Sequence, residues 1–158
     1  EGAVRGTEIA IKKMGKHNGG KGGIVVNIAS NSGLLPFDFF PYYASTKAAT
    51  VHFSRIMGGK FHHGYHGVSI LCLCPAAVNT ILTTGHIIER TAYNKYVADI
   101  IPDFMSKLNL LEPNEVAEAV IRVINENKSG EVALFDKSAG FFYVPPSLDN
   151  STMGLEEY

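Results

Sequence analysis

The sequence contains no tryptophan, only two cysteines and no long hydrophobic run. No apolar stretch approaches the roughly 20 residues that a helix needs to span a bilayer, so we expect no membrane association. Basic residues form no stripe and the formal net charge is −1, which argues against nucleic-acid binding. The 158 residues are 46% hydrophobic and 18% charged, a composition that predicts a single globular domain over 1–158.

The two cysteines, Cys72 and Cys74, alternate within an apolar run. On a strand both side chains point the same way, and a disulfide at that spacing is strained. No signal peptide is visible at the start of the sequence. We therefore expect two buried thiols in a reducing compartment, which favours a cytoplasmic protein. The glycosylation patterns at Asn127 and Asn150 are then interpreted as chance matches.

Helices and strands alternate along the chain. Helical periodicity predicts helices over 3–16, about 42–57 and from 113 to about 127, with partly helical structure over 81–107. Apolar runs predict strands over 24–28, 68–74 and 131–135. The first two runs are continuous enough to suggest burial on both faces. This order is typical of the α/β class, with a Rossmann-like doubly wound parallel sheet. Because three strands make a small sheet, we expect N-terminal strands to be missing from this chain.

Chemistry is suggested first by Tyr43 and Lys47. Residues four apart lie on one face of a helix, so the phenol and the ammonium converge, whereas Tyr42 lies about 140° away from the lysine. A positive charge about 4 Å from a phenolate stabilises it by roughly 4 kcal/mol at an effective dielectric of 20. A tyrosine and a lysine four residues apart would be expected about as often by chance in a sequence of this composition. The alternative interpretation is therefore an ordinary contact on a helix surface.

The surrounding sequence strengthens the interpretation. Ser30 follows the strand 24–28 and precedes Tyr43 by thirteen residues. Open α/β sheets bind ligands at the carboxyl ends of their strands, where the loop that starts at Pro75 also arrives. Ser32 is a competing candidate, although the spacing favours Ser30 and leaves Ser32 a role in positioning the loop.

Three motifs together resemble the short-chain dehydrogenase/reductase family: Asn-Ile-x-Ser at 27–30, Tyr-x-x-x-Lys at 43–47 and Pro-x-x-Val-x-Thr at 75–80. The stretches 18–28 and 43–49 look like the branch that holds 15-hydroxyprostaglandin dehydrogenase and insect alcohol dehydrogenases. The resemblance covers nearly the whole chain. It implies hydride transfer between a nicotinamide cofactor and a secondary alcohol or ketone, with NAD favoured by the branch and NADP left open.

The resemblance also implies roles for individual residues. Ser30 would hydrogen-bond the substrate oxygen, Tyr43 would exchange the alcohol proton, and Lys47 would hold the nicotinamide ribose. In the loop after Pro75, the Val78 backbone and Thr80 would contact the nicotinamide amide; an ordinary loop with a capping threonine is the alternative. The catalytic residues are thus Ser30, Tyr43 and Lys47, and the cofactor-binding residues are Tyr43, Lys47, Pro75, Val78 and Thr80.

The chain departs from the family pattern in two respects. Ala76 stands where the family usually has glycine, and alanine does not adopt a positive φ cheaply. The glycine-rich dinucleotide turn is absent, and the catalytic asparagine would fall just upstream of Glu1, which is no initiator methionine. We therefore expect a C-terminal fragment of the enzyme. The alternatives are a non-catalytic binding or storage protein of the same fold, or an inactive truncated product.

The remaining features either indicate no function or allow more than one interpretation. His62, His63 and His66 are expected in a solvated loop rather than in a zinc site. The family implies that 81–107 is a substrate lid. Its apolar residues suggest an apolar substrate, although half of them would equally suit the core: Ile81, Leu82, Ile87, Ile88, Tyr93 and Tyr96. The small residues of the catalytic helix favour a homodimer, again as in the family: Ala44, Ser45, Ala48 and Ala49. The tail comprises 141–158, and its first part, 141–146, either closes the pocket or contacts a partner.

Overall fold

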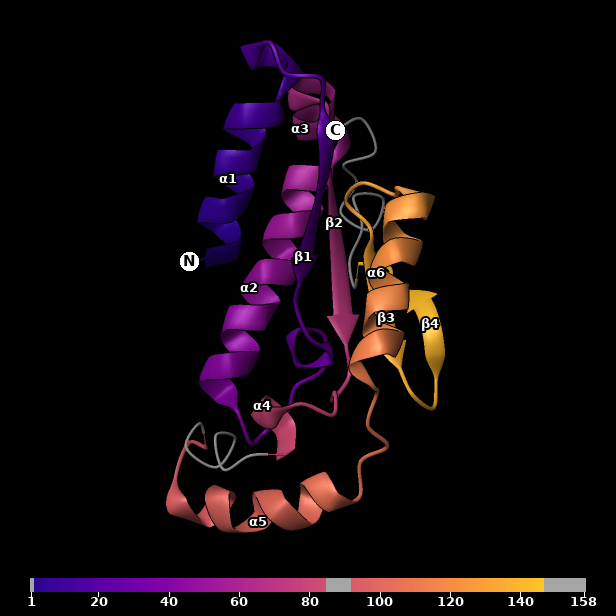
Figure 1. Cartoon of the computed structure of the whole chain (residues 1–158). Coiled ribbons are helices and arrows are strands. Elements are labelled where there is room, and N and C mark those ends of the chain that lie inside the picture. The colour runs from indigo at the N-terminus through magenta and orange to yellow at the C-terminus, as the bar shows by residue number, and fades with distance from the viewer. Residues whose placement is uncertain (1, 85–91, 147–158) are drawn as a thin grey trace.

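The structure, a computed structural model, describes residues 2–84 and 92–146 (Figure 1). In chain order the elements are α1 (Gly2–Met14), η1 (Lys16–Asn18), β1 (Gly23–Ile28), η2 (Asn31–Gly33), α2 (Pro41–Gly58), α3 (Lys60–His66), β2 (Val68–Pro75), α4 (Ile81–Thr84), α5 (Lys95–Ser106), α6 (Pro113–Glu126), β3 (Val132–Asp136) and β4 (Gly140–Tyr143). The three predicted strands and the predicted helices that became α1, α2 and α6 are confirmed to within two residues at each end.

The sheet has the order β1-β2-β3-β4. β1, β2 and β3 run parallel, as predicted, so their carboxyl ends lie at one edge. The added strand β4 pairs antiparallel with β3 and was not expected. A tight turn explains it, because the Asp136 side chain accepts hydrogen bonds from the backbone N–H groups of Ser138 and Ala139, and Gly140 has a φ of 80°.

β2 is the centre of the core and is buried along its whole length. Because side chains alternate along a strand, Cys72 and Cys74 pack toward α2 with Val51, whereas Leu71 and Leu73 pack toward α6. Figure 1 shows α1 and α2 on one side of the sheet and α6 on the other. The doubly wound arrangement is therefore confirmed, and both cysteines are buried free thiols as expected.

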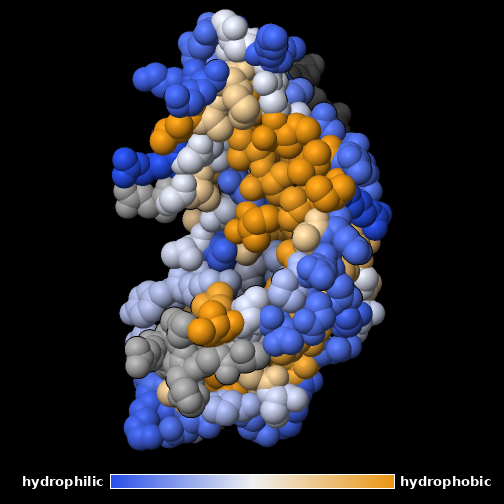
Figure 2. Space-filling view, in the orientation of Figure 1, coloured by the Kyte–Doolittle hydropathy of each residue, from blue (hydrophilic) through white to orange (hydrophobic). Residues whose placement is uncertain are grey.

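β1 differs from the prediction that this run is buried on both faces. Ile24 is 38% exposed and Ile28 is 44% exposed. The reason is that, among the described residues, β1 pairs with β2 alone and so lies at an edge of the sheet. Figure 2 shows apolar side chains gathered over β1 and toward α6, where Ile121 is also exposed.

A buried polar cluster ties α1 and α2 to β1. Asn27 donates from its side-chain amide to the hydroxyl of Ser54 over 2.9 Å and shares a 3.3 Å hydrogen bond with Thr7. All three side chains are at most 6% exposed. Because buried polar groups are costly unless they are paired, this cluster fixes the position of α2 against the middle of α1 and the sheet.

The segment 60–66 is the short helix α3, not the solvated loop predicted from its histidines. His66 is 2% exposed, and its Nδ1 accepts a hydrogen bond from the backbone N–H of Val68 over 3.0 Å. This bond explains the burial, because it joins the end of α3 to the start of β2. Among the helices that the structure describes, none is both long and apolar enough to cross a membrane.

Candidate active site

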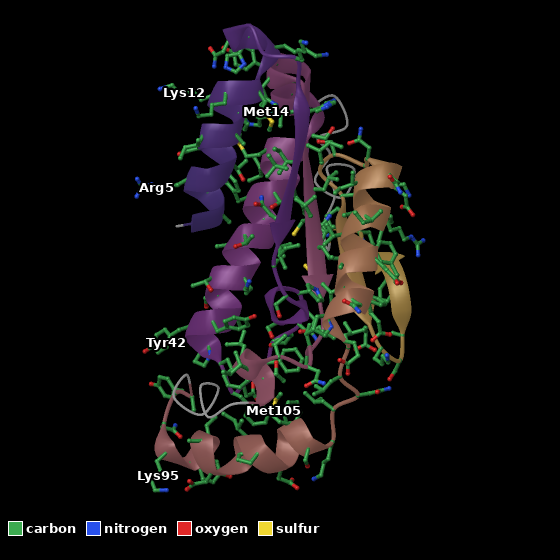
Figure 3. The ribbon with its side chains drawn as sticks, in the orientation of Figure 1. Arg5, Lys12, Met14, Tyr42, Lys95 and Met105 are labelled. Atoms are coloured by element: carbon green, nitrogen blue, oxygen red, sulfur yellow. The ribbon has the colours of Figure 1, made fainter. Side chains whose placement is uncertain are left out.

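The first turns of α2 carry Tyr43 and Lys47. Pro41 opens the helix, where its missing N–H is not needed. The Lys47 ammonium lies 5.6 Å from the centre of the Tyr43 ring. Tyr42 is 72% exposed and points away from the sheet in Figure 3. The choice of Tyr43 as the partner of Lys47, made from helix geometry, therefore agrees with the structure.

Lys47 is held at the carboxyl end of β1. Its Nζ donates a hydrogen bond to the Ile28 carbonyl oxygen over 3.1 Å. Burial lowers the pKa of this ammonium, against a smaller opposing effect from Cys74 and Cys72 on the neighbouring strand. The positive charge is thus fixed between the sheet edge and the Tyr43 ring.

Ser30 lies just beyond β1 and is 8% exposed. It caps η2, accepting a hydrogen bond from the Ser32 backbone N–H over 3.2 Å and donating to the Asn31 side chain over 3.3 Å. Ser32 therefore orients the Ser30 hydroxyl through its own backbone.

Gly33 brings this loop against α2. A Cβ on Gly33 would lie 2.7 Å from the carbonyl carbon of Lys47, closer than side chains are found. Only a glycine allows η2 to approach α2 at this point, and the approach places the loop that carries Ser30 beside the turn that carries Lys47.

The loop after β2 reaches the same edge. Pro75 is the last residue of β2 and pairs with Phe135, whose carbonyl accepts a hydrogen bond from Ala76. Val78 forms a parallel bridge with Leu111. Among the described residues other than glycine, Asn127 alone has a positive φ, so Ala76 takes no conformation that would need a glycine. Thr80 follows at the end of this loop, immediately before α4.

Two open pockets flank α2. One, of about 420 Å³, lies between the start of α1, Ile28 and Lys47. The surface in Figure 2 is hollowed in this part of the molecule. The other, of about 840 Å³, lies on the opposite side of the helix, with Arg55 and His52 among its residues. Neither pocket is lined by Ser30 or Tyr43 within the described residues.

The predicted lid 81–107 contains α4 and α5. Figure 1 shows α5 lying across the carboxyl edge of the sheet. The Phe104 ring of α5 contacts the ring of Phe39, 4.8 Å between centres, so the helix is tied to the loop before α2. The described apolar candidates of the lid are all at least half exposed, not core: Ile81, Leu82, Tyr93 and Tyr96. Ile87 and Ile88 lie outside the described residues.

Sequence reasoning missed the contacts that hold the loop 76–80. Asn79 and Glu112 are 33 residues apart and share a side-chain hydrogen bond. No local sequence pattern links these two residues. The sequence indicated only that Glu112 stands just before a predicted helix.

The chain is similar in sequence to known dehydrogenases. The family model described as short chain dehydrogenase matches residues 1–90. The chain is 29% identical over 143 residues to 15-hydroxyprostaglandin dehydrogenase [NAD(+)] of Homo sapiens, covering 89% of this chain and 53% of the relative. It is 33% identical over 108 residues to alcohol dehydrogenase 1 of Ceratitis capitata, covering 68% and 40%.

The chain thus spans about half the length of the curated relatives that it matches. Among solved structures it is similar to the crystal structure, with bound NAD, of a protein described as a D-mannonate oxidoreductase from Haemophilus influenza. The TM-score is 0.50 at 18% identity, over 70% of this chain and 40% of that one. At this identity the likeness supports the Rossmann-like fold alone.

Proposed function

We propose that this chain, which belongs to the short-chain dehydrogenase family, supplies the reaction centre of an oxidoreductase that transfers hydride between NAD and a secondary alcohol or ketone. The proposal rests on the position of Lys47, because its ammonium lies over the Tyr43 ring and is hydrogen-bonded to the end of β1. The chain spans about half of its relatives, so the activity proposed is that of the full-length protein.

Tyr43 is proposed as the acid–base residue. A phenolate beside the Lys47 charge accepts the proton of a bound alcohol, and the phenol returns it to the ketone in reverse. Lys47 stabilises the phenolate electrostatically, because its charge is held near the ring and partly shielded from water. Ser30 would turn its single hydroxyl proton from the Asn31 side chain to the substrate oxygen, while the Ser32 backbone N–H holds the hydroxyl oxygen in place.

The residues present suit the nicotinamide end of the cofactor. Within residues 2–84 and 92–146, one of the three N–H groups of Lys47 donates to Ile28, so two remain for ribose hydroxyls. The Val78 backbone and Thr80, beyond Pro75, would contact the carboxamide. When bound, the nicotinamide accepts the hydride from the alcohol carbon. The NAD(+) in the name of the human relative favours NAD over NADP.

An apolar substrate is proposed from the lid. Its exposed apolar side chains, which include Ile81, Leu82 and Tyr96, lie on the segment that adjoins the carboxyl edge. Burial of such side chains on a bound substrate would remove apolar surface from water.

A homodimer and a cytoplasmic location complete the proposal. On α2 the small residues Ser45, Ala48 and Ala49 are exposed, so close packing by them needs a further partner, and we propose a second subunit for this role. Sedimentation of the full-length protein tests this, with a dimer expected. The buried free thiols Cys72 and Cys74 are compatible with a reducing compartment.

The direct test of the reaction is label transfer. The full-length protein is incubated with NAD, and separately with NADP, and with secondary alcohols deuterated at the carbinol carbon. We expect reduced NAD that carries the label, from apolar alcohols more readily than from polar ones. If NAD binds but no alcohol transfers deuterium to either cofactor, the non-catalytic alternative is correct.

A further inference from the structure

The loop 76–80 is joined to the segment that re-enters the fold after α5. The Asn79 N–H donates to the Leu111 carbonyl over 2.8 Å, and the Leu111 N–H donates to the Ala77 carbonyl over 2.9 Å. The chain between Thr80 and Leu111 contains α4 and α5. Backbone pairing of residues 77–79 with Leu111 therefore holds the two ends of this segment together.

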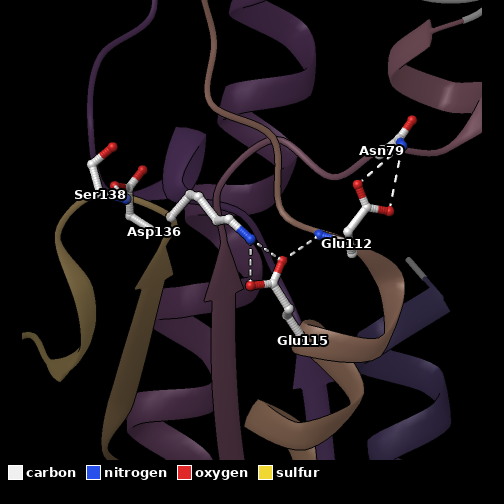
Figure 4. Close-up of polar contacts among 6 residues, drawn as sticks. Asn79, Glu112, Glu115, Asp136 and Ser138 are labelled. Carbon is white, nitrogen blue, oxygen red and sulfur yellow. Dashed lines mark hydrogen bonds and ion pairs between the residues drawn. The ribbon is translucent and has the colours of Figure 1, made fainter.

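A side-chain contact reinforces this backbone pairing. The Asn79 amide donates to both carboxylate oxygens of Glu112, over 3.1 and 3.3 Å (Figure 4). Hydrogen bonds to a charged partner are stronger than those between neutral groups.

Glu112 is itself fixed by the start of α6. It forms a capping box with Glu115: each carboxylate accepts a hydrogen bond from the backbone of the other residue. Glu115 also pairs with Lys137 from the turn between β3 and β4, as Figure 4 shows. The residue that receives Asn79 is thus fixed by the amino terminus of α6.

We propose that Asn79 and Glu112 are positioning residues, which hold the backbone of Val78 and Thr80 in place for the nicotinamide and so set the affinity for NAD. The inference rests on the proposed function, because it takes this loop as part of the cofactor site. Neither side chain touches the cofactor. Their effect reaches it through the loop backbone.

Three variants of the full-length protein test the pair. Asn79→Ala removes both side-chain contacts to the Glu112 carboxylate, and we expect the dissociation constant for NAD to rise about fivefold. Asn79→Asp places a carboxylate against Glu112, and we expect a rise of about tenfold or more. The double variant Asn79→Asp/Glu112→Gln restores an amide–carboxylate pair in the reverse sense, so NAD affinity should return to near that of the wild type.

Two readouts separate positioning from a general loss of structure. The KM for NAD should rise in Asn79→Asp while kcat and the KM for the alcohol at saturating NAD stay nearly unchanged. The defect of Asn79→Asp should also shrink as the pH falls, because two facing carboxylates then share a proton. Lys137→Gln is the matched control: it breaks the outer ion pair with Glu115, leaves Asn79 and Glu112 paired, and should bind NAD as the wild type does.

Hydrogen exchange tests the same pair without any cofactor. Asn79→Ala should raise the exchange rate of the amides over 76–80 about tenfold, with Lys137→Gln unchanged. Wild-type exchange in Asn79→Ala, or a double variant as weak for NAD as Asn79→Asp, overturns the inference. If the wild-type protein fails to bind NAD while the exchange results hold, the loop is anchored as described and the proposed function is what fails.

Discussion

The two ends of the parallel strands both carry clusters of ionisable and polar side chains, and the two clusters are used differently. At the carboxyl ends lie Ser30, Tyr43 and Lys47, beside a pocket of about 420 Å³. At the amino ends lies the histidine-bearing helix α3, where His66 is 2% exposed and accepts a hydrogen bond from the backbone of Val68. In the first cluster Lys47 lines a space that a ligand can enter, whereas in the second cluster His66 is packed inside the fold.

The difference shows that residue type alone does not identify a site. Three histidines within five residues look as reactive as a serine, a tyrosine and a lysine. The direction of the strands decides between them, because loops at the carboxyl edge of a parallel sheet meet around an open crevice. At the amino edge the polar groups instead close the junction between α3 and β2.

The largest expected effect comes from removing the charge at the carboxyl edge. Lys47→Met should lower kcat/KM about a thousandfold, because the phenolate of Tyr43 loses its electrostatic support and the ribose its donor. Lys60→Met is the matched control at the other edge, since Lys60 lies 5.0 Å from the centre of the Phe61 ring. Comparable losses in steady-state rate for the two variants would contradict the comparison.

The second effect separates the two serines. Ser30→Ala should lower kcat about a hundredfold, because the substrate oxygen loses its donor. Ser32→Ala should stay within about threefold of the wild type, since Ser32 contacts Ser30 through its backbone N–H, which the substitution keeps. Steady-state kinetics of both variants check this, and a larger loss in Ser32→Ala would reverse the assignment.

The third effect concerns two glycines, one at each edge. Gly33→Ala should destabilise the protein by about 1–3 kcal/mol, because its Cβ would meet the backbone of Lys47. Gly64, in α3, has nothing within 4 Å of a Cβ, and Gly64→Ala should be neutral or stabilise by up to about 1 kcal/mol. Denaturant unfolding measures both free energies. Equal destabilisation by the two substitutions is the result that this packing excludes.

The smallest effect is a pH dependence of stability at the amino edge. Burial lowers the pKa of His66, and the neighbouring His63, His62 and His17 lower it further, against the raising effect of the Met57 carbonyl. The unfolded chain takes up the proton near pH 6.5, whereas the folded protein takes it up at lower pH. The contribution of His66 is therefore complete above about pH 6.5 and falls as the pH drops toward the folded pKa.

Replacing His66 isolates this contribution. His66→Asn keeps an acceptor for the Val68 N–H and removes the titration, so the free energy of unfolding should fall less steeply between neutral and mildly acidic pH. His62→Asn, in the same helix, serves as the control and should keep the wild-type slope. Identical slopes in wild type and His66→Asn would show that the burial of this ring has no effect on acid stability.

Much of the fold was predictable because its signals are local. The apolar run 68–74 became the fully buried β2, and the spacing of Tyr43 and Lys47 placed both on one helix face. The burial of β1 was not predictable in the same way. Its run of β-branched residues resembles that of β2, but burial depends on neighbours, and β1 pairs along one edge only.

Other features were not predicted, because they depend on tertiary packing or on residues that are far apart in the sequence. The helix α3 contains Gly64 and three histidines, which are weak helix formers, and tertiary packing of His66 overrides that weakness. The contact between Asn79 and Glu112 joins residues far apart in sequence, and a single chain carries no signal for it. Local spacing therefore predicted the contact between Tyr43 and Lys47, but not the contact that supports the loop 76–80.

The most direct test of the reaction centre compares two neighbouring tyrosines. Tyr43→Phe and Tyr42→Phe remove the same hydroxyl from adjacent positions of α2, one beside Lys47 and the other 72% exposed. In the full-length protein, with NAD and an alcohol that transfers its deuterium, we predict that Tyr43→Phe loses at least about a thousandfold in kcat while Tyr42→Phe stays near the wild type. Near wild-type turnover in Tyr43→Phe would contradict the account.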